Sequence, residues 1–123
     1  ACPTQAIVQQ DEHWSVDSRR CISYLTIALR GPMPGEHRDA PGPRVFGCDI
    51  CQEVCPWNTR APETDDPAFT PQYDPAPALE ELARLTPDEF RARFRHTPVM
   101  RAKYEGLMRN VNLALPEPCK SDA

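Results

Sequence analysis

Three cysteines within eight consecutive positions constrain this chain more than any other feature of its sequence. They stand in the order Cys48-Asp-Ile-Cys51-Gln-Glu-Val-Cys55, and Pro56 follows the third. The C-x2-C spacing puts two sulfur atoms on one tight loop, where both can ligate the same metal centre. The segment is therefore predicted to fold around a metal site.

A Cys-Pro pair also stands at the start of the chain, as Cys2-Pro3. In bacterial ferredoxins with two iron–sulfur clusters, a run of ligands ends in Cys-Pro, and its last cysteine binds the other cluster. The sequence resembles the ends of two such runs. By this crossover one [4Fe-4S] cluster takes four thiolates, those of Cys2, Cys21, Cys48 and Cys51.

Cys55 is left over by this assignment, and we expect it to bind a second cluster whose other three ligands would precede Ala1. Residue 1 is alanine, and no basic segment with an apolar core follows it. We therefore expect the chain to be a piece of a longer protein.

Two other cysteine chemistries compete with iron and sulfur. A zinc site would accept the four thiolates of Cys21, Cys48, Cys51 and Cys55, but zinc explains neither Cys-Pro ending. A disulfide framework would need an exported protein, which nothing in the sequence indicates. Cys119 stands in a polar tail and is expected to be an ordinary free thiol.

Other residue types offer weaker signals. The isolated His13, His37 and His96 are expected at the surface. Trp14 and Trp57 flank the cysteine segments and are expected to shield a cluster from water. The sequence has no Gly-rich phosphate loop and no H-E-x-x-H motif, which argues against a hydrolytic or phosphoryl-transfer enzyme.

Proline content and helical periodicity divide the chain into three parts. Fifteen of the 123 residues are proline, more than twice ordinary usage. Residues 1–61 are predicted to form the cluster domain, and 62–77 an acidic, Pro-rich linker. Residues 78–123 are predicted to form a basic helical module. The longest apolar run, Ile22 to Leu29, is far below the roughly 20 residues of a membrane span.

Capping patterns predict where helices begin. A helix is expected after Asp17 or Ser18, with Cys21 in its first turn and Gly31-Pro32 at its end. Residues 31–47 are rich in Gly and Pro and are predicted to be irregular. Downstream, apolar spacing indicates a short helix from Leu79, a second from the capping box at Thr86, and a third after Thr97-Pro98. These helices fit the start of a HEAT-like repeat, with a self-contained helical hairpin as the alternative.

Charge is distributed unevenly. Residues 1–83 carry 6 Lys or Arg against 13 Asp or Glu, whereas residues 84–109 carry seven bases and three acids. A basic module on an acidic chain suggests a polyanionic partner, although a solvated, arginine-rich helix face would give the same balance.

Longer strings resemble epoxyqueuosine reductases. The strings are Asp17-Ser-Arg-Arg-Cys21-Ile-Ser-Tyr-Leu-Thr-Ile-Ala-Leu-Arg-Gly31 and Val45-Phe-Gly-Cys48-Asp-Ile-Cys51-Gln-Glu-Val-Cys55-Pro-Trp-Asn58, with a third from Phe90 to Val111. The resemblance implies a cytoplasmic iron–sulfur oxidoreductase that uses cobalamin to convert epoxyqueuosine to queuosine at the wobble position of tRNA. It implies two [4Fe-4S] clusters with the ligand crossover given above.

The same resemblance implies contacts for three further residues near the cluster. Ser23, Cys48 and Asp49 would approach the cobalamin. Contacts to the tRNA anticodon stem-loop would come from Arg30, Arg101, Lys103, Arg109 and Asn110. The family's catalytic proton donor has no counterpart in this piece, so no catalytic residue is predicted, and the tail after Leu115 departs from the family pattern.

The predicted fold is therefore mostly α, with a ferredoxin-like [4Fe-4S] domain followed by a short HEAT-like segment. We expect a monomer that receives electrons from an unidentified donor and has no membrane partner. Two alternatives stay open at this point. One is a cobalamin-dependent reductive dehalogenase, which has no use for a basic arm, and the other is a plain electron-transfer ferredoxin, which makes no cobalamin contact.

Overall fold

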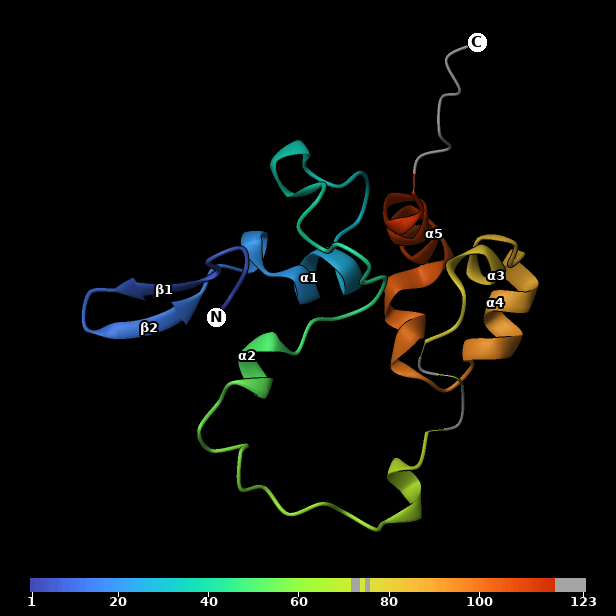
Figure 1. Cartoon of the computed structure of the whole chain (residues 1–123). Coiled ribbons are helices and arrows are strands. Elements are labelled where there is room, and N and C mark those ends of the chain that lie inside the picture. Colours follow the sequence, from blue (N-terminus) through green and yellow to red (C-terminus); the bar gives the residue numbers. More distant parts are fainter. Residues whose placement is uncertain (72–73, 75, 117–123) are drawn as a thin grey trace.

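The computed structural model describes residues 1–71, 74 and 76–116 (Figure 1). Near the N-terminus, strands β1 (Ile7–Gln10) and β2 (His13–Val16) form an antiparallel hairpin in which Ile7 lies opposite Val16. Asp11 opens the turn with a φ of 52°, a conformation that Asp tolerates better than most residues. The fold predicted from the sequence is mostly α and lacks this hairpin.

The helix predicted after Asp17 is present but shorter than expected. Asp17 caps the 3-10 turn η1 (Ser18–Arg20), and Cys21 is the N-cap of α1 (Ile22–Ile27), one position before the helix rather than in its first turn. α1 ends before Leu29, and Gly31 follows with a φ of 82°. The face of α1 that carries Ile22, Leu25 and Thr26 is buried.

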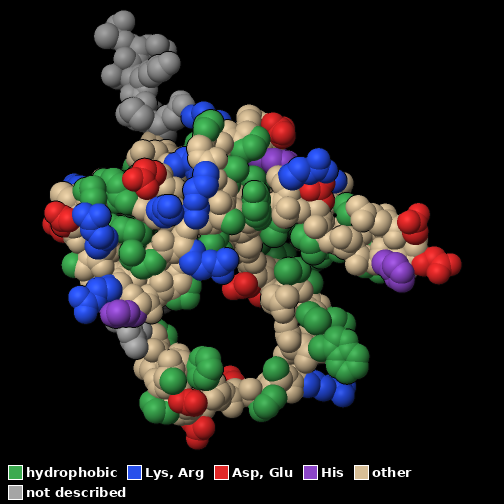
Figure 2. All heavy atoms as spheres, turned by 180° about the vertical axis from the view of Figure 1, so that it is seen from behind, with side chains coloured by type: hydrophobic (Ala, Val, Ile, Leu, Met, Phe, Trp, Pro, Cys, Tyr) green, Lys and Arg blue, Asp and Glu red, His purple; other side chains and the backbone are tan. Residues whose placement is uncertain are grey.

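The segment after α1 is irregular, as predicted. Its regular pieces are the 3-10 turn η2 (Gly35–His37) and the short helix α2 (Ile50–Glu53). A second irregular stretch carries the turn η3 (Pro67–Phe69), and residues 56–71 are exposed. In Figure 2 this stretch arches away from the rest of the molecule.

The C-terminal helices share one apolar core. They are α3 (Leu79–Ala83), α4 (Pro87–Phe94), the 3-10 helix η4 (Pro98–Ala102) and α5 (Lys103–Ala114). The predicted capping box at Thr86 is confirmed, because its side chain accepts from Glu89 N–H and the Glu89 carboxylate accepts from Thr86 N–H. The core consists of Leu82, Phe90, Phe94, Leu107 and Val111.

The single helix predicted after Thr97 is divided in two. Lys103, where η4 gives way to α5, has a φ of 60° and a ψ of 168°, a region of backbone space that glycine alone occupies readily. The helical periodicity of the sequence is unbroken there, so it did not predict the break. The assignment of these helices to the start of a HEAT-like repeat stays a prediction.

α1 packs against α5 and η4, so the cysteine-containing part and the helical part of the chain are in contact (Figure 1). We call residues 1–58 the cluster segment and residues 79–115 the helical segment. None of the helices in the described part of the chain has the length and apolar character needed to cross a bilayer.

Candidate metal centre

Five cysteines of the cluster segment are free thiols: Cys2, Cys21, Cys48, Cys51 and Cys55. Cys2 lies in the turn before β1, and Cys21 occupies the N-cap position of α1. Cys48, Cys51 and Cys55 lie before, within and after the short helix α2. Cys119 lies outside the described residues.

Consecutive turns after Cys48 shape the backbone between Cys48 and Cys55. The N–H groups of Gln52 and Glu53 both donate to Asp49 O, at 2.8 and 2.9 Å, and Cys55 N–H donates to Gln52 O at 3.2 Å. The Asn58 amide then donates to Gln52 O at 2.9 Å. These bonds curl the chain around Cys51, which is exposed and accessible to a metal centre.

Cys2 has the environment of a thiolate. Burial of its sulfur disfavours the charged form, but hydrogen bonds from the Thr4 hydroxyl and from nearby N–H groups outweigh this effect and lower the pKa of Cys2 to about 7. The Ala6 N–H lies 3.3 Å from Cys2 Sγ. The thiolate is the form that binds metals, so the donor at Cys2 suits a ligand.

A close contact joins the helix that follows Cys21 to the loop that contains Cys48. Cys48 N–H donates to Ser23 Oγ at 3.0 Å, and the Ser23 hydroxyl lies 3.1 Å from Cys48 O. Thr26 Oγ1 accepts from Gly47 N–H at 2.9 Å. Two of the residues predicted to meet cobalamin, Ser23 and Cys48, are thus in direct contact, and Asp49 is exposed beside them.

The thiols do not converge on one point. Among the described residues, no three His, Cys, Asp or Glu side chains lie close enough together to hold a single ion. The ligands of a [4Fe-4S] cluster need not meet at one point, because each of its four thiolates binds a different iron atom. The chemistry of the donor set, four or more soft thiolates with N–H donors beside one of them, fits such a cluster.

The histidines and tryptophans contribute little to this centre. His13 and His96 are exposed, and His37 is half-buried. Trp14 is 70% exposed and Trp57 is 89% exposed. Most of each indole ring faces solvent, the opposite of the shielding role predicted for these two residues.

The residues predicted to contact tRNA divide into two groups. Arg30, Arg101 and Lys103 are exposed, and Lys and Arg side chains gather on the packed part of the molecule in Figure 2. Arg30 also donates to Arg101 O at 2.9 Å. A cavity of about 340 Å³ between the end of α1 and the start of α5 includes Arg30 and Lys103 in its lining.

Arg109 and Asn110 form the other group, since they connect the two segments. Asn110 is 2% exposed, and its amide donates to Thr26 O at 2.8 Å and to Val45 O at 2.9 Å. Arg109 donates to backbone carbonyls at the end of α1. Asn110 is therefore buried between the two segments, and its predicted contact with tRNA stays a prediction.

Sequence reasoning missed the connecting role of Arg109 and Asn110, and it did not single out Thr26, which is 0% exposed. A signal was present, because Thr26 follows Leu25 on an apolar helix face and Asn110 stands between Leu107 and Val111. A polar residue within an apolar face usually has a buried hydrogen-bond partner.

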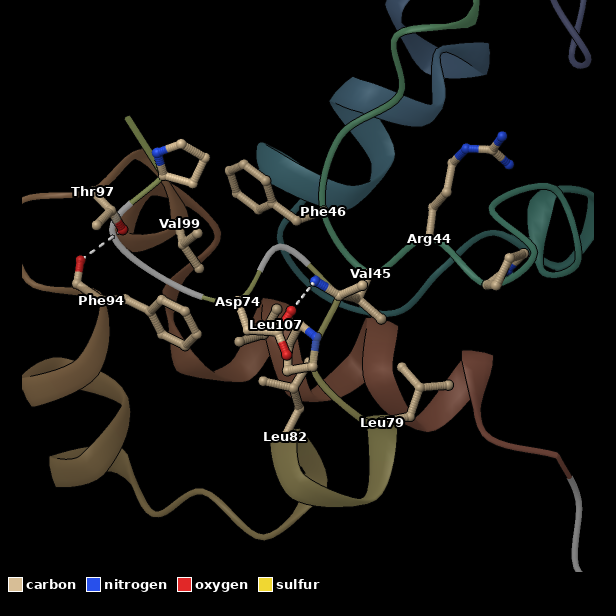
Figure 3. Close-up of a pocket in the computed structure, with 14 residues that line it drawn as sticks. Arg44, Val45, Phe46, Asp74, Leu79, Leu82, Phe94, Thr97, Val99 and Leu107 are labelled. Carbon is tan, nitrogen blue, oxygen red and sulfur yellow. Dashed lines mark hydrogen bonds between the residues drawn. The ribbon is translucent and has the colours of Figure 1, made fainter. Parts of the chain in front are cut away.

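A second cavity, of about 610 Å³, lies among the helices (Figure 3). Phe94, Leu107 and Leu82 line it together with residues 43–46, and no cysteine is part of its lining. This apolar cavity belongs to the helical core and not to the metal centre.

Comparison with known proteins gives matches for both segments. Residues 1–58 match the family of 4Fe-4S double cluster binding domains, so the ferredoxin-like cluster domain is confirmed. An epoxyqueuosine reductase of Cellulophaga algicola is 42% identical over 113 residues, 91% of this chain and 36% of that relative. One of Pseudomonas aeruginosa is 45% identical over 115 residues, 93% of this chain and 31% of that relative.

A solved structure shares the fold. An epoxyqueuosine reductase bound to an epoxyqueuosine-modified stem loop of tRNA-Tyr superposes with a TM-score of 0.80 at 36% identity, over 94% of this chain and 30% of that one. The resemblance predicted from the sequence is confirmed. The chain spans about a third of the length of these relatives.

Proposed function

We propose that this chain is a segment of an epoxyqueuosine reductase, the iron–sulfur oxidoreductase that converts epoxyqueuosine to queuosine in tRNA. One observation carries the proposal: the five-cysteine pattern lies on a fold that matches a reductase bound to its modified stem loop with a TM-score of 0.80. The segment would supply cluster ligands and part of the tRNA surface.

We assign the cluster ligands as the sequence predicted. A double-cluster domain with four thiolates per cluster needs eight cysteines, and residues 1–58 contain five. Cys55 would bind the second cluster, and its partners would lie in another part of the protein. The first cluster would be held by Cys2, Cys21, Cys48 and Cys51.

The residues around this cluster would orient it and its neighbour cofactor. Ser23 fixes both backbone polar groups of Cys48, which orients that ligand, and Ser23, Cys48 and Asp49 would contact cobalamin. The clusters would supply electrons, and bound cobalamin would supply the reduced cobalt chemistry that removes the epoxide oxygen. The cobalamin contacts rest on the resemblance.

Exposed basic side chains support a role in tRNA binding. Arg30, Arg101 and Lys103 lie near one another, since Arg30 donates to Arg101 O and lines a cavity with Lys103. Lys and Arg neutralise phosphates and release counterions, so they supply affinity without reading sequence. In this proposal Arg109 and Asn110 support the surface from behind.

The remaining parts of the proposal rest on the resemblance alone. The helical segment would begin a HEAT-like repeat after the linker at 62–77. The protein would act in the cytoplasm as a monomer and accept electrons from an unidentified donor.

The test is anaerobic reconstitution with iron and sulfide, followed by metal analysis and visible spectra before and after dithionite. About four irons and four sulfides per chain, with absorbance that bleaches on reduction, are expected for one complete cluster. About one zinc per chain in a colourless product would contradict the proposal.

The tRNA arm is tested with an epoxyqueuosine-modified stem loop. Arg101→Ala should lower the salt slope of binding by about 1 for each phosphate that the Arg101 side chain neutralises. Arg91→Ala is the control, because Arg91 pairs with Asp88 on the exposed face of α4. For a reductive dehalogenase, Arg101→Ala and Arg91→Ala would give the same salt slope. For a plain ferredoxin, replacement of Ser23 or Asp49 would leave cobalamin binding unchanged.

A further inference from the structure

Asn110 and Arg109 of the helical segment hold parts of the cluster segment that are distant in sequence. Asn110 lies 84 residues from Thr26 and 65 from Val45, yet it donates to the backbone oxygens of both, at 2.8 and 2.9 Å. Thr26 O belongs to α1, and Val45 O belongs to the loop that leads to Cys48. One buried amide therefore holds the loop and the helix together.

Further hydrogen bonds continue from this amide to Cys48. Thr26 accepts from Gly47 N–H at 2.9 Å, and Ser23 bonds the N–H and the carbonyl of Cys48 at 3.0 and 3.1 Å. Gly47 and Cys48 are thus hydrogen-bonded to α1. Val45 is hydrogen-bonded to the side-chain amide of Asn110, which also bonds to α1. Cys21 caps the same helix, so its position relative to Cys48 depends on this set of bonds.

Arg109 fixes the other end of α1. Its guanidinium donates to Leu25 O at 2.7 Å, to Gly31 O at 2.8 Å and to Leu29 O at 3.2 Å. Leu25 O lies in the last turn of α1, and the other two carbonyls follow the helix. A positive charge is favourable at this end of a helix. Burial, and secondarily the charge of Arg30, lower the pKa of Arg109. Two further bonds, at 3.0 and 2.9 Å, run to Asn110 Oδ1 and orient the amide.

We propose that Asn110 and Arg109 are positioning residues of the iron–sulfur site, which hold the Cys48 loop against α1 so that Cys21 and Cys48 face the same cluster. The inference rests on the proposed function, since it takes these cysteines as cluster ligands. Groups that orient metal ligands without touching the metal typically change metal affinity by 10- to 100-fold when they are replaced. The helical segment thereby controls the geometry of a centre to which it contributes no ligand.

The test compares Asn110→Asp with Asn112→Asp in the reconstituted 123-residue chain. Asp has the shape of Asn but donates no hydrogen bond, and it keeps an oxygen for Arg109. Asn112 lies on the same helix and is exposed, so it carries the same change without the contacts. We expect Asn110→Asp to lower the affinity for iron, measured by competition with a chelator, by about tenfold, to shift the EPR signal of the reduced cluster and to change its midpoint potential. Asn112→Asp should match the unmodified chain in all three.

Arg109→Lys is the second variant. It keeps the positive charge but loses the planar fork that reaches several carbonyls at once, so it should shift the EPR signal in the same direction. Circular dichroism of each variant reports whether the helices are retained. Loss of helix in both variants, or cluster properties equal to those of the unmodified chain, would overturn the inference.

The outcomes also separate this inference from the proposed function. If the unmodified chain binds no iron and sulfide, the proposed function fails. If it binds them and both variants behave like it, only the positioning role fails.

Discussion

The two segments of this chain are ordered by different means. The helical segment buries large apolar side chains against one another, with Phe90 2% exposed and Val111 0% exposed. The cluster segment buries few large side chains, chiefly Ile22 and Leu25, and much of its length is turn and loop. An ordinary apolar core is sufficient for the first segment, whereas the second needs cross-links between distant loops.

The cysteines explain how a segment with so small a core can have a defined structure. Small domains that cannot bury enough apolar surface commonly depend on metals or disulfides. A metal centre that forms only in the folded state contributes its binding free energy to folding. In our proposal the cluster is therefore a structural element of residues 1–58 as well as an electron carrier.

Removal of the cluster should have the largest effect and should affect the segments unequally. After iron is chelated, we expect the N–H groups of Gln52, Glu53 and Cys55 to lose protection. The short turns that they close lie largely at the surface and are no longer held by the metal centre once the thiolates are released. The N–H groups of α5 should keep theirs. Hydrogen exchange followed by mass spectrometry measures both. Equal loss in the two segments would contradict a difference in what orders them.

Truncation of the apolar core should affect the helical segment. Phe90→Ala removes a ring that lies 5.4 Å from Phe94 and 6.0 Å from Tyr104 between centroids, and changes of this kind cost about 3–5 kcal/mol. Phe69→Ala is the control, because that ring is 73% exposed and its loss should cost about 0.5 kcal/mol or less. Urea unfolding followed by circular dichroism gives both values, and similar midpoints for the two variants would contradict the assigned core.

The sequence predicted those features that depend on residues close together in the chain. The capping box of Thr86 and Glu89 lies within one helical turn, and the cysteine spacing lies within one loop, so both were recognised. The hairpin was missed because each strand has only four residues, too few for alternation to be distinguished from chance.

The parts that could not be predicted depend on residues far apart. Asn110 was predicted to contact tRNA, and its hydrogen bonds to Thr26 and Val45, 84 and 65 residues away, were not foreseen. The contact of Ser23 with Cys48 also spans 25 residues. The resemblance to a known family suggested that Ser23 and Cys48 share a site, but no local pattern specifies the hydrogen bond between them.

A smaller effect is expected at Lys103, where η4 meets α5. Lys103 holds a backbone conformation that costs a residue with a Cβ about 1–3 kcal/mol, so Lys103→Gly should stabilise the chain by about 1 kcal/mol. Asn112→Gly, inside α5, should instead destabilise it by roughly 0.3 kcal/mol, because glycine has a lower helix propensity than asparagine. Opposite shifts of Tm are expected, and a lower Tm for Lys103→Gly would show that Lys103 is not strained.

The smallest effect is expected at the capping box of α4. It tests whether local electrostatics add to the stability of the helical segment. Hydrogen bonds from the Thr86 N–H and hydroxyl lower the pKa of Glu89. A carboxyl whose pKa is lower in the folded state adds stability above its unfolded pKa, and this contribution is lost as the pH falls through the folded value. The Tm of the chain should therefore decrease on acidification from the ordinary range of a glutamate carboxyl downward.

The side chain in Glu89→Gln cannot ionise, so this variant should lose this part of the pH dependence. Glu105→Gln, on α5, should keep it. Identical Tm profiles for Glu89→Gln and the unmodified chain would mean that the helical segment depends on its apolar core alone, and the contrast with the thiolate-dependent cluster segment would then be sharper.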